Sequence, residues 1–202
     1  KPITMAWDAR GRLWTMTALE YPVDANENRA NAEALYARGG KDQVWVIDHP
    51  ERSEPQTARV FAQGLALPLG LLPDLDGNGA FVHYGSQIRR YIDTDKDGKA
   101  DKFDVILEGF GIQDSHSIAN SLRWGPDGWL YGAIGSTVTA DIARPGLDRS
   151  PVTHITGQAI WRYDPATRRF EVFAEGGGNA FGCEIDAKGR VFSGHNGGDT
   201  RG

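Results

Sequence analysis

Short runs of alternating apolar and polar residues, separated by turns, recur along the whole chain. A turn segment containing Asp and Gly leads into a short apolar strand four times, in segments that begin at Trp7, Leu72, Trp124 and Ile185. The Asp-x-x-Gly and Pro-Asp-Gly pieces suit hairpin turns, and the residues that flank them suit paired strands. The segments begin about 50 to 65 residues apart, near the size of one propeller blade with its loops.

Further strand pairs lie between these repeats. The clearest are 43–48 with 58–61 and 159–164 with 170–174. The pattern predicts an all-β protein, a β-propeller of four-stranded blades with about four blades in residues 1–202. It admits either a closed four-bladed ring or part of a larger ring. The chain stops in mid-loop after a strand, so we expect it to be truncated at its C-terminal end, with further blades missing.

Two segments depart from the strand pattern. Residues 26–37 are polar and Ala-rich and end at Gly39 and Gly40, which predicts a helix within a surface insertion at 26–40. Residues 137–156 show no clear period. We expect them to form a long loop over one face, where functional residues often lie.

Composition and charge narrow the class of protein. The chain has 202 residues, of which 40% are hydrophobic and 24% charged, enough for a substantial core. The net charge of −5 and the lack of a basic stretch argue against nucleic-acid binding. No apolar run reaches the roughly 20 residues of a transmembrane helix. Because Lys1-Pro2 is an unusual natural start, we expect the chain to begin after processing or cleavage.

Several side chains are candidates for the core. Cys183 is the single cysteine and lies in a strand-like run, so we expect a buried, unreactive thiol and no disulfide within the chain. Tryptophans in or beside the predicted strands are expected to pack between blades, with stacking on a sugar as the alternative for any one of them. These are Trp7, Trp14, Trp124, Trp129 and Trp161.

Residues 93–104 have the ligand order of an EF-hand-type calcium loop. Acidic residues occupy positions 1, 3, 5, 9 and 12, and a glycine that permits a sharp turn occupies position 6. Strand-like segments flank the loop, so the prediction is a structural calcium site on a β scaffold; a solvated acidic turn is the alternative. The predicted metal ligands are Asp93, Asp95, Asp97, Lys99 through its carbonyl group, Asp101 and Asp104.

Several motifs together resemble a known family. They are the calcium-type loop, Gly109-Phe-Gly, Asp114-Ser-His116, Asn120-Ser-Leu-Arg-Trp-Gly-Pro-Asp-Gly-Trp-Leu-Tyr-Gly132 and Gly194-His-Asn-Gly-Gly-Asp199. The chain resembles the membrane-bound dehydrogenase domain of Planctomycetes and Verrucomicrobia. That family is similar to the soluble PQQ-dependent glucose and sorbosone dehydrogenases, which are six-bladed propellers. The resemblance therefore implies that these blades belong to a six-bladed ring.

The resemblance also implies a catalytic base. In the quinoprotein dehydrogenases a histidine that follows an acidic residue, shortly before a Gly-Pro-Asp-Gly hairpin, takes the proton of the sugar hydroxyl. His116 occupies this place, and Asp114 precedes it by two residues. An imidazole is suited to accepting a proton near neutral pH. From the residues alone, the alternative is a loop histidine that bonds a backbone carbonyl group.

The cofactor residues implied by the resemblance match only in part. Asn179 and Gly182 are kept from the quinone-binding signature, but Gly178 stands where that signature has an arginine. Loss of a bidentate arginine weakens a site for a tricarboxylate. The loop that supplies carbonyl oxygens to the quinone-bound calcium aligns with Asn196, Gly197 and Gly198. Calcium is thus an expected cofactor, and PQQ is a second one.

Two functions follow as alternatives. The first is a quinoprotein-like dehydrogenase that oxidises a sugar or other alcohol and passes electrons to a cytochrome c. With it we expect a periplasmic or extracellular location, with membrane association through other parts of the parent protein as a further option. The second is a non-catalytic, calcium-stabilised propeller that binds a glycan or a partner protein. A third reading is a fragment with no separate function. The partners expected are a sugar or alcohol substrate and either a cytochrome c domain or the missing C-terminal blades.

Overall fold

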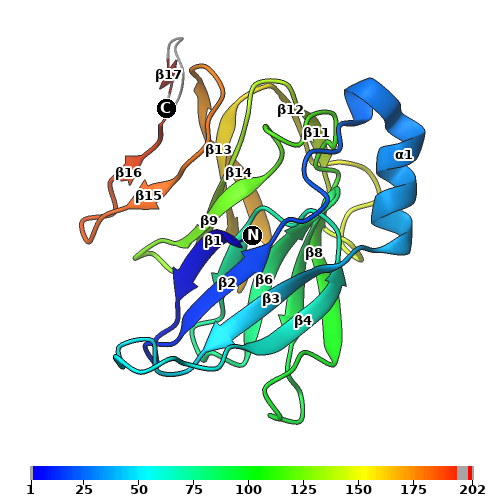
Figure 1. The fold of residues 1–202 in the computed structure, drawn as a ribbon. Helices are drawn as coiled ribbons and strands as arrows, with labels where there is room; N and C mark the ends of the chain where they lie inside the picture. Colours follow the sequence, from blue (N-terminus) through cyan, green and yellow to red (C-terminus); the bar gives the residue numbers. More distant parts are fainter. Residues whose placement is uncertain (1, 195–199, 202) are drawn as a thin grey trace.

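Antiparallel sheets follow one another along the chain (Figure 1). The computed structural model describes residues 2–194 and 200–201. The first sheet contains β1 (Pro2–Trp7), β2 (Leu13–Thr17), β3 (Asp42–Ile47) and β4 (Arg59–Leu65). The second contains β5 (Leu71–Pro73), β6 (Gly79–Tyr84), β7 (Gln87–Ile92) and β8 (Lys102–Glu108). The third contains β9 (Asn120–Trp124), β10 (Leu130–Ile134), β13 (Ala159–Asp164) and β14 (Arg169–Gly176), with β17 (Thr200–Arg201) beside β14.

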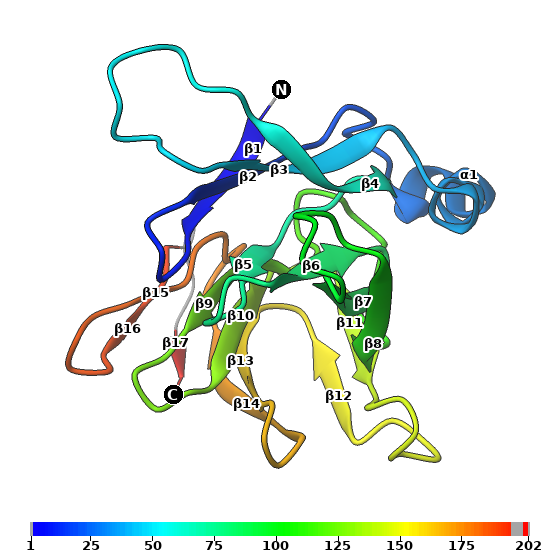
Figure 2. The ribbon, with the colours of Figure 1, turned by 90° about the horizontal axis from the view of Figure 1, so that it is seen from below.

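The first strands of successive sheets lie next to one another. β1 contacts β5, β5 contacts β9, and β9 contacts β15 (Glu184–Ile185), which pairs with β16 (Val191–Phe192). The second sheet lies between the first and the third (Figure 2). Sheets that share a line of first strands and stack face to face form a β-propeller. The predicted all-β propeller is confirmed; the first two sheets have four strands each, and the third has β17 as a fifth.

Two of the four repeated Asp-Gly turns use the same hydrogen bonds. Arg12 donates its backbone N–H to Oδ1 of Asp8 (3.0 Å) and its Nε–H to Oδ2 (2.6 Å). Arg190 makes the same two bonds to Asp186, at 2.9 and 2.7 Å. The β15–β16 hairpin therefore repeats the β1–β2 hairpin that begins the first sheet.

Each pair of neighbouring sheets encloses an apolar cluster. Trp14 and Phe61 of the first sheet pack with Tyr91 of the second. On its other face the second sheet contributes Phe81 to a cluster with Trp161 of the third. Burial of such large side chains is the main force that holds the sheets together.

The predicted core residues are buried with one exception. Trp14, Trp161 and Cys183 are fully buried, and burial raises the pKa of the Cys183 thiol to about 12. Trp124 and Trp129 are partly buried against the clusters. The prediction that Trp7 packs between blades is wrong for the described sheets, because 62% of this residue is exposed on β1, the edge strand of the first sheet.

The two segments without a strand pattern have different outcomes. The predicted helix is present as α1 (Ala25–Arg38), and Gly39 ends it with a φ of 76°. The long loop expected at 137–156 is instead a hairpin of β11 (Thr139–Ile142) and β12 (Thr153–Thr156). Ile142 and Ile155 anchor this hairpin in the core between the second and third sheets. These strands have four residues each, too short to show a period.

Two carboxyl groups meet beside the start of β3. Asp42 is fully buried, and its carboxylate accepts hydrogen bonds from Thr17 Oγ1 (2.8 Å) and from the backbone N–H groups of Leu19 and Leu67 (2.7 and 2.9 Å). Glu20 lies against Asp42, and the pKa of Glu20 is raised by burial and by this neighbouring carboxyl group. Two carboxyl groups in contact favour protonation of one of them.

We expect Glu20→Gln to flatten the pH dependence of stability. The pKa of Glu20 is higher in the folded chain than its ordinary value of about 4.5, so its contribution is complete below that value and is lost as the pH rises through the folded pKa. Thermal unfolding at several pH values between about 4 and 7 measures this slope. Glu33→Gln is the control, because Glu33 is exposed on α1. Equal slopes for the wild type and Glu20→Gln would contradict the expectation.

Candidate functional site

The predicted base and its acidic neighbour are in contact. In the loop before β9, both the backbone N–H and Nδ1 of His116 bond Oδ1 of Asp114, at 2.8 and 2.9 Å. A turn closed by the Ser117 N–H on the Asp114 carbonyl group (2.9 Å) brings the two side chains together. About half of the His116 side chain (52%) is exposed, and its Nε2 has no hydrogen-bond partner among the described residues.

Asp114 is held as a carboxylate. Burial alone would raise its pKa, but hydrogen bonds from Thr137 Oγ1 (2.6 Å) and from His116 outweigh burial and lower the pKa. A carboxylate with fixed donors orients an imidazole and stabilises its protonated form. The dyad therefore has the geometry of a general base whose free nitrogen faces outward.

Hydrogen bonds connect this dyad to Asn179, which lies more than 60 residues further along the chain. Thr137 Oγ1 lies 2.6 Å from Ser117 Oγ, and Ser117 Oγ donates to Oδ1 of Asn179 at 3.0 Å. The Ser136 N–H also donates to Asn179 Oδ1, at 3.2 Å. The structure thus brings together three predicted residues from two separate motifs. This oxygen of Asn179 serves to join two loops.

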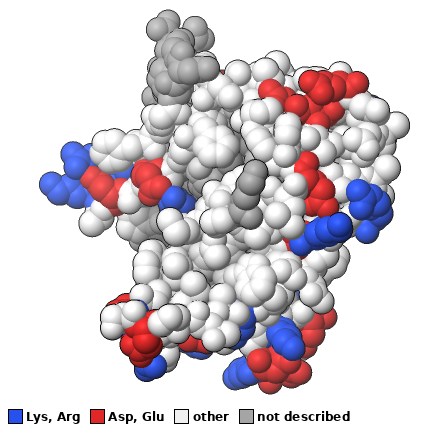
Figure 3. All heavy atoms as spheres, viewed as in Figure 1, with Lys and Arg blue, Asp and Glu red and all other residues white. Residues whose placement is uncertain are grey.

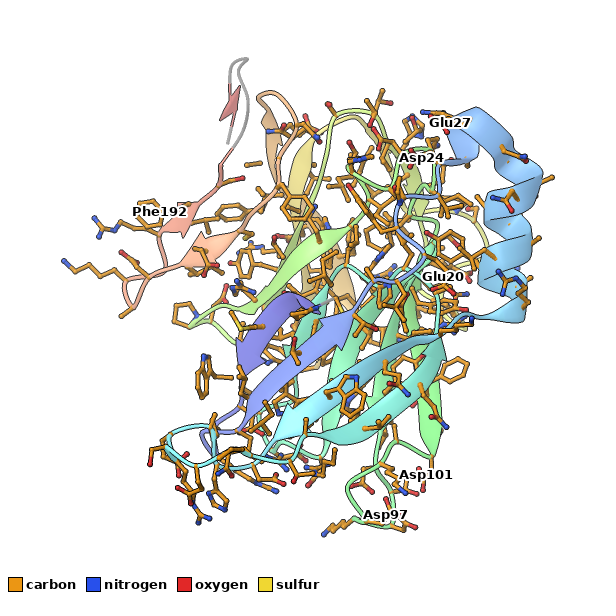
Figure 4. All side chains as sticks on the ribbon, viewed as in Figure 1. Glu20, Asp24, Glu27, Asp97, Asp101 and Phe192 are labelled. Atoms are coloured by element: carbon orange, nitrogen blue, oxygen red, sulfur yellow. The ribbon has the colours of Figure 1, made fainter. Side chains whose placement is uncertain are left out.

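Two residues of this site were missed by sequence reasoning. Oδ1 of Asp24 accepts hydrogen bonds from Ser115 N–H (2.6 Å) and Ser115 Oγ (2.5 Å). The ring of Tyr21 meets the imidazole of His116 edge-on, with 5.0 Å between the ring centres. Asp24 lies at the start of α1 (Figure 4), yet its side chain makes no capping bond to the helix. The position of Asp24 in the sequence suits a helix cap, so the sequence does not show that its side chain bonds Ser115 instead.

Asp24, Asp114 and His116 also form a group with the donors of a metal site. One ligand atom from each lies within 4.8 Å of the others. Two carboxylates with one imidazole suit a divalent cation. The same atoms also suit the hydroxyl groups of a ligand, which bond well to carboxylates.

The calcium-type loop joins β7 to β8 at the opposite end of the molecule. Carboxylate oxygens of Asp93, Asp95 and Asp97 lie within 4.8 Å of one another. Asp93 is buried and accepts the Gly98 N–H at 2.8 Å, and Asp97 accepts the Lys99 N–H at 2.8 Å. Acidic side chains gather at this lower end (Figure 3), where Figure 4 labels Asp97 and Asp101. Three carboxylates of one tight turn fit a calcium ion.

The structure does not bring all five predicted carboxylates of the loop together. Asp101 bonds Thr94 instead, at 2.5 Å to Oγ1. Asp104 lies within β8 and pairs with Lys102 at 3.0 Å. The twelve-residue ligand order is therefore only partly realised, because strand β8 begins before the loop pattern ends.

The described residues do not fit PQQ. Gly178 stands where the quinone-binding signature has an arginine, and the neighbouring carboxylates of Asp24 and Asp114 would repel a tricarboxylate. Gly182 has a φ of 131°, and its carbonyl oxygen accepts a bond from Ser193 Oγ at 2.9 Å. The other predicted cofactor residues, Asn196, Gly197 and Gly198, lie outside the described residues.

Fold and site together define a β-propeller protein with an imidazole–carboxylate site at one end and an acidic loop at the other. The chain belongs to the family described as a domain of unknown function, DUF7133, whose model matches residues 1–201. No curated protein sequence matches the chain. None of the helices in the described part is long and apolar enough to cross a membrane.

Solved structures of two proteins are similar in fold. One is a luciferin-regenerating enzyme, with a TM-score of 0.56 and 11% identity; the match covers 90% of this chain and 48% of that one. The other is regucalcin, a calcium-binding protein from Agrobacterium tumefaciens, with a TM-score of 0.50, 13% identity and the same coverage. This chain thus spans about half the length of either protein. At such low identity the likeness concerns the fold alone, and the dehydrogenase resemblance of the sequence stays a prediction.

Proposed function

We propose that this propeller carries a dehydrogenase-type site that acts on a sugar or other alcohol. The observation that supports this most directly is the 2.9 Å contact between His116 Nδ1 and Asp114 Oδ1. It leaves Nε2 of a half-exposed imidazole available to a substrate hydroxyl group. The sequence resemblance to quinoprotein dehydrogenases points to the same residue and the same role.

The chemistry assigned to these residues is proton transfer. Oxidation of an alcohol removes the hydroxyl proton and a hydride from the carbon that bears it. Nε2 of His116 accepts the proton, and Asp114 stabilises the imidazolium that forms. A quinone-type acceptor would take the hydride as two electrons and a proton, and a cytochrome c partner would take the electrons onward one at a time. Because the described residues do not fit PQQ, no step is assigned to it.

A calcium-stabilised binding module is the second candidate. It is favoured by the carboxylates of Asp93, Asp95 and Asp97, which lie far from His116 and suit a structural ion. Regucalcin, whose fold is similar, is described as a calcium-binding protein. In this alternative the His116 end of the propeller holds a glycan or a partner protein without reaction.

Further blades are proposed as partners of the described sheets. Ile3, Met5 and Trp7 expose apolar side chains on β1, at one end of the row of sheets. At the other end a groove of about 340 Å³ is lined in part by Phe173 and Phe192, which are also exposed. Large exposed apolar groups at both ends suit packing against more blades. A periplasmic or extracellular location is proposed with them, because it suits electron transfer to a cytochrome c.

Dye reduction tests the proposal. The protein that carries this chain is loaded with calcium and given glucose, other sugars and simple alcohols, with a redox dye and with or without added PQQ. Turnover that depends on the sugar is the expected result. No turnover under any of these conditions would refute the dehydrogenase and leave the binding module. Turnover without PQQ would show that another acceptor serves the site.

A further inference from the structure

Tyr21 lies beside the proposed catalytic base and keeps 39% of its surface exposed. Its ring meets the His116 imidazole edge-on at 5.0 Å, with an interplanar angle of 66°. Burial raises the pKa of Tyr21, and the carboxylates of Asp24 and Asp114 raise it further. The phenol group is therefore close to the same two carboxylates that surround the imidazole.

The segment that carries Tyr21 is held firmly at both ends. Before it, the Leu19 N–H bonds buried Asp42 at 2.7 Å. After it, Asp24 is bonded to Ser115, and the Ala25 N–H donates to the Ile112 carbonyl group at 3.2 Å. A backbone segment fixed in advance loses little conformational freedom when a ligand arrives. Tyr21 is therefore suited to binding rather than to filling space.

Two polar atoms of the Asp24, Asp114 and His116 group have no hydrogen-bond partner among the described residues. Oδ2 of Asp24 and Nε2 of His116 accept no hydrogen bond in the described part of the chain, and both belong to the same compact group of side chains. Two carboxylates repel anionic ligands, so phosphorylated sugars and sugar acids are disfavoured. Among alcohol substrates, which the proposed function requires, the best match is neutral, rich in hydroxyl groups, and apolar on one face. A pyranose ring has all three properties, because its axial C–H groups form an apolar face.

We propose that Tyr21 is the aromatic platform of a binding site for a neutral pyranose, whose hydroxyl groups bond Asp24 and His116. This inference rests on the proposed function, because it takes His116 as the group that meets the reacting hydroxyl. It extends that function by naming the ring form of the substrate and a residue that selects it. Aromatic side chains with a few fixed polar groups are the usual lining of small-molecule sites.

Binding of three probes tests the inference. Calorimetry and the NMR signals of the imidazole groups measure this binding. Methyl β-D-glucopyranoside offers a neutral ring, D-sorbitol offers hydroxyl groups without a ring, and D-glucuronate offers a charged ring. We expect the glucoside to bind best and to shift the His116 signals. Tyr21→Ala should weaken its binding about 2- to 10-fold, as loss of a stacking contact does. Tyr21→Phe keeps the ring and should stay within about 2-fold.

Phe192→Ala is the matched control, because Phe192 is an exposed aromatic residue on β16, away from Asp24 (Figure 4). Equal affinity for sorbitol and the glucoside, or unchanged affinity in Tyr21→Ala, would overturn the inference. So would His116 signals that respond to calcium ions and not to the glucoside. The proposed function fails separately: glucoside binding without any dye reduction would remove the dehydrogenase and keep the platform. Equal turnover of sugars in Tyr21→Ala and the wild type would remove the platform and keep the dehydrogenase.

Discussion

Calcium should raise the thermal unfolding midpoint of the metal-free protein by about 5 to 10 °C when it is present at about 100 times its dissociation constant. Binding to the folded state alone at that ratio stabilises by about 2.7 kcal/mol. For a chain of this size each kcal/mol corresponds to about 2–4 °C. Differential scanning calorimetry before and after chelation measures the shift.

The shift is expected to reflect contact between the first two sheets. The calcium-type loop belongs to the second sheet, but the Ala100 N–H donates to the Phe61 carbonyl group of β4 at 2.7 Å. Arg59 of β4 also donates to the carbonyl group of Gly98. An ion that orders the loop therefore orders a contact between sheets. Loss of the ion should loosen this end of the molecule first.

Matched asparagine variants locate the ligands. Asp93→Asn should remove most of the calcium shift, because Asp93 is buried within the carboxylate group. Asp104→Asn should keep the shift, because Asp104 lies on β8 and pairs with Lys102. Equal loss in both variants would favour the complete twelve-residue ligand set and count against the three-carboxylate site. The absence of any shift in the wild type would reject calcium.

Local patterns in the sequence were enough to predict the fold. Residues within an Asp-Gly turn determine its geometry, since the hydrogen bonds around Asp8 recur around Asp186. Gly39 likewise marks the end of α1 through a backbone conformation that suits glycine. Such signals act over a few residues, so they can be read without the tertiary structure.

The parts that sequence did not predict depend on contacts between distant segments. Tyr21 and Asp24 join the site through His116 and Ser115, more than 90 residues away. No local sequence pattern indicates contacts between segments so far apart in the chain. Asp104 shows the opposite case: its spacing fits a calcium loop, but pairing of β8 with β7 places it in the sheet, outside the group formed by Asp93, Asp95 and Asp97. Tertiary pairing overrides a local motif in this case.

His116→Gln is expected to lower the rate of sugar-dependent dye reduction by about 10²- to 10⁴-fold, the usual contribution of a general base. Glutamine is polar and similar in reach, so the loop can keep its shape while the proton acceptor is lost. Asp114→Asn should also lower the rate. The carboxylate of Asp114 lies 2.9 Å from His116 Nδ1, and an amide in its place cannot stabilise the imidazolium that forms. Single-turnover rates at saturating sugar separate this loss from weaker binding.

The chain provides its own control in a second imidazole–carboxylate pair. Nδ1 of His154 lies 2.7 Å from Asp141 Oδ1 on the β11–β12 hairpin, with its Nε2 bonded to Thr156 at 2.9 Å. Because both nitrogens of His154 are occupied, His154→Gln should leave the rate unchanged. A loss in His154→Gln as large as in His116→Gln would show that the effect comes from folding rather than proton transfer. If the rate instead survives both His116→Gln and Asp114→Asn, then the dyad only shapes the loop, and the base must lie elsewhere.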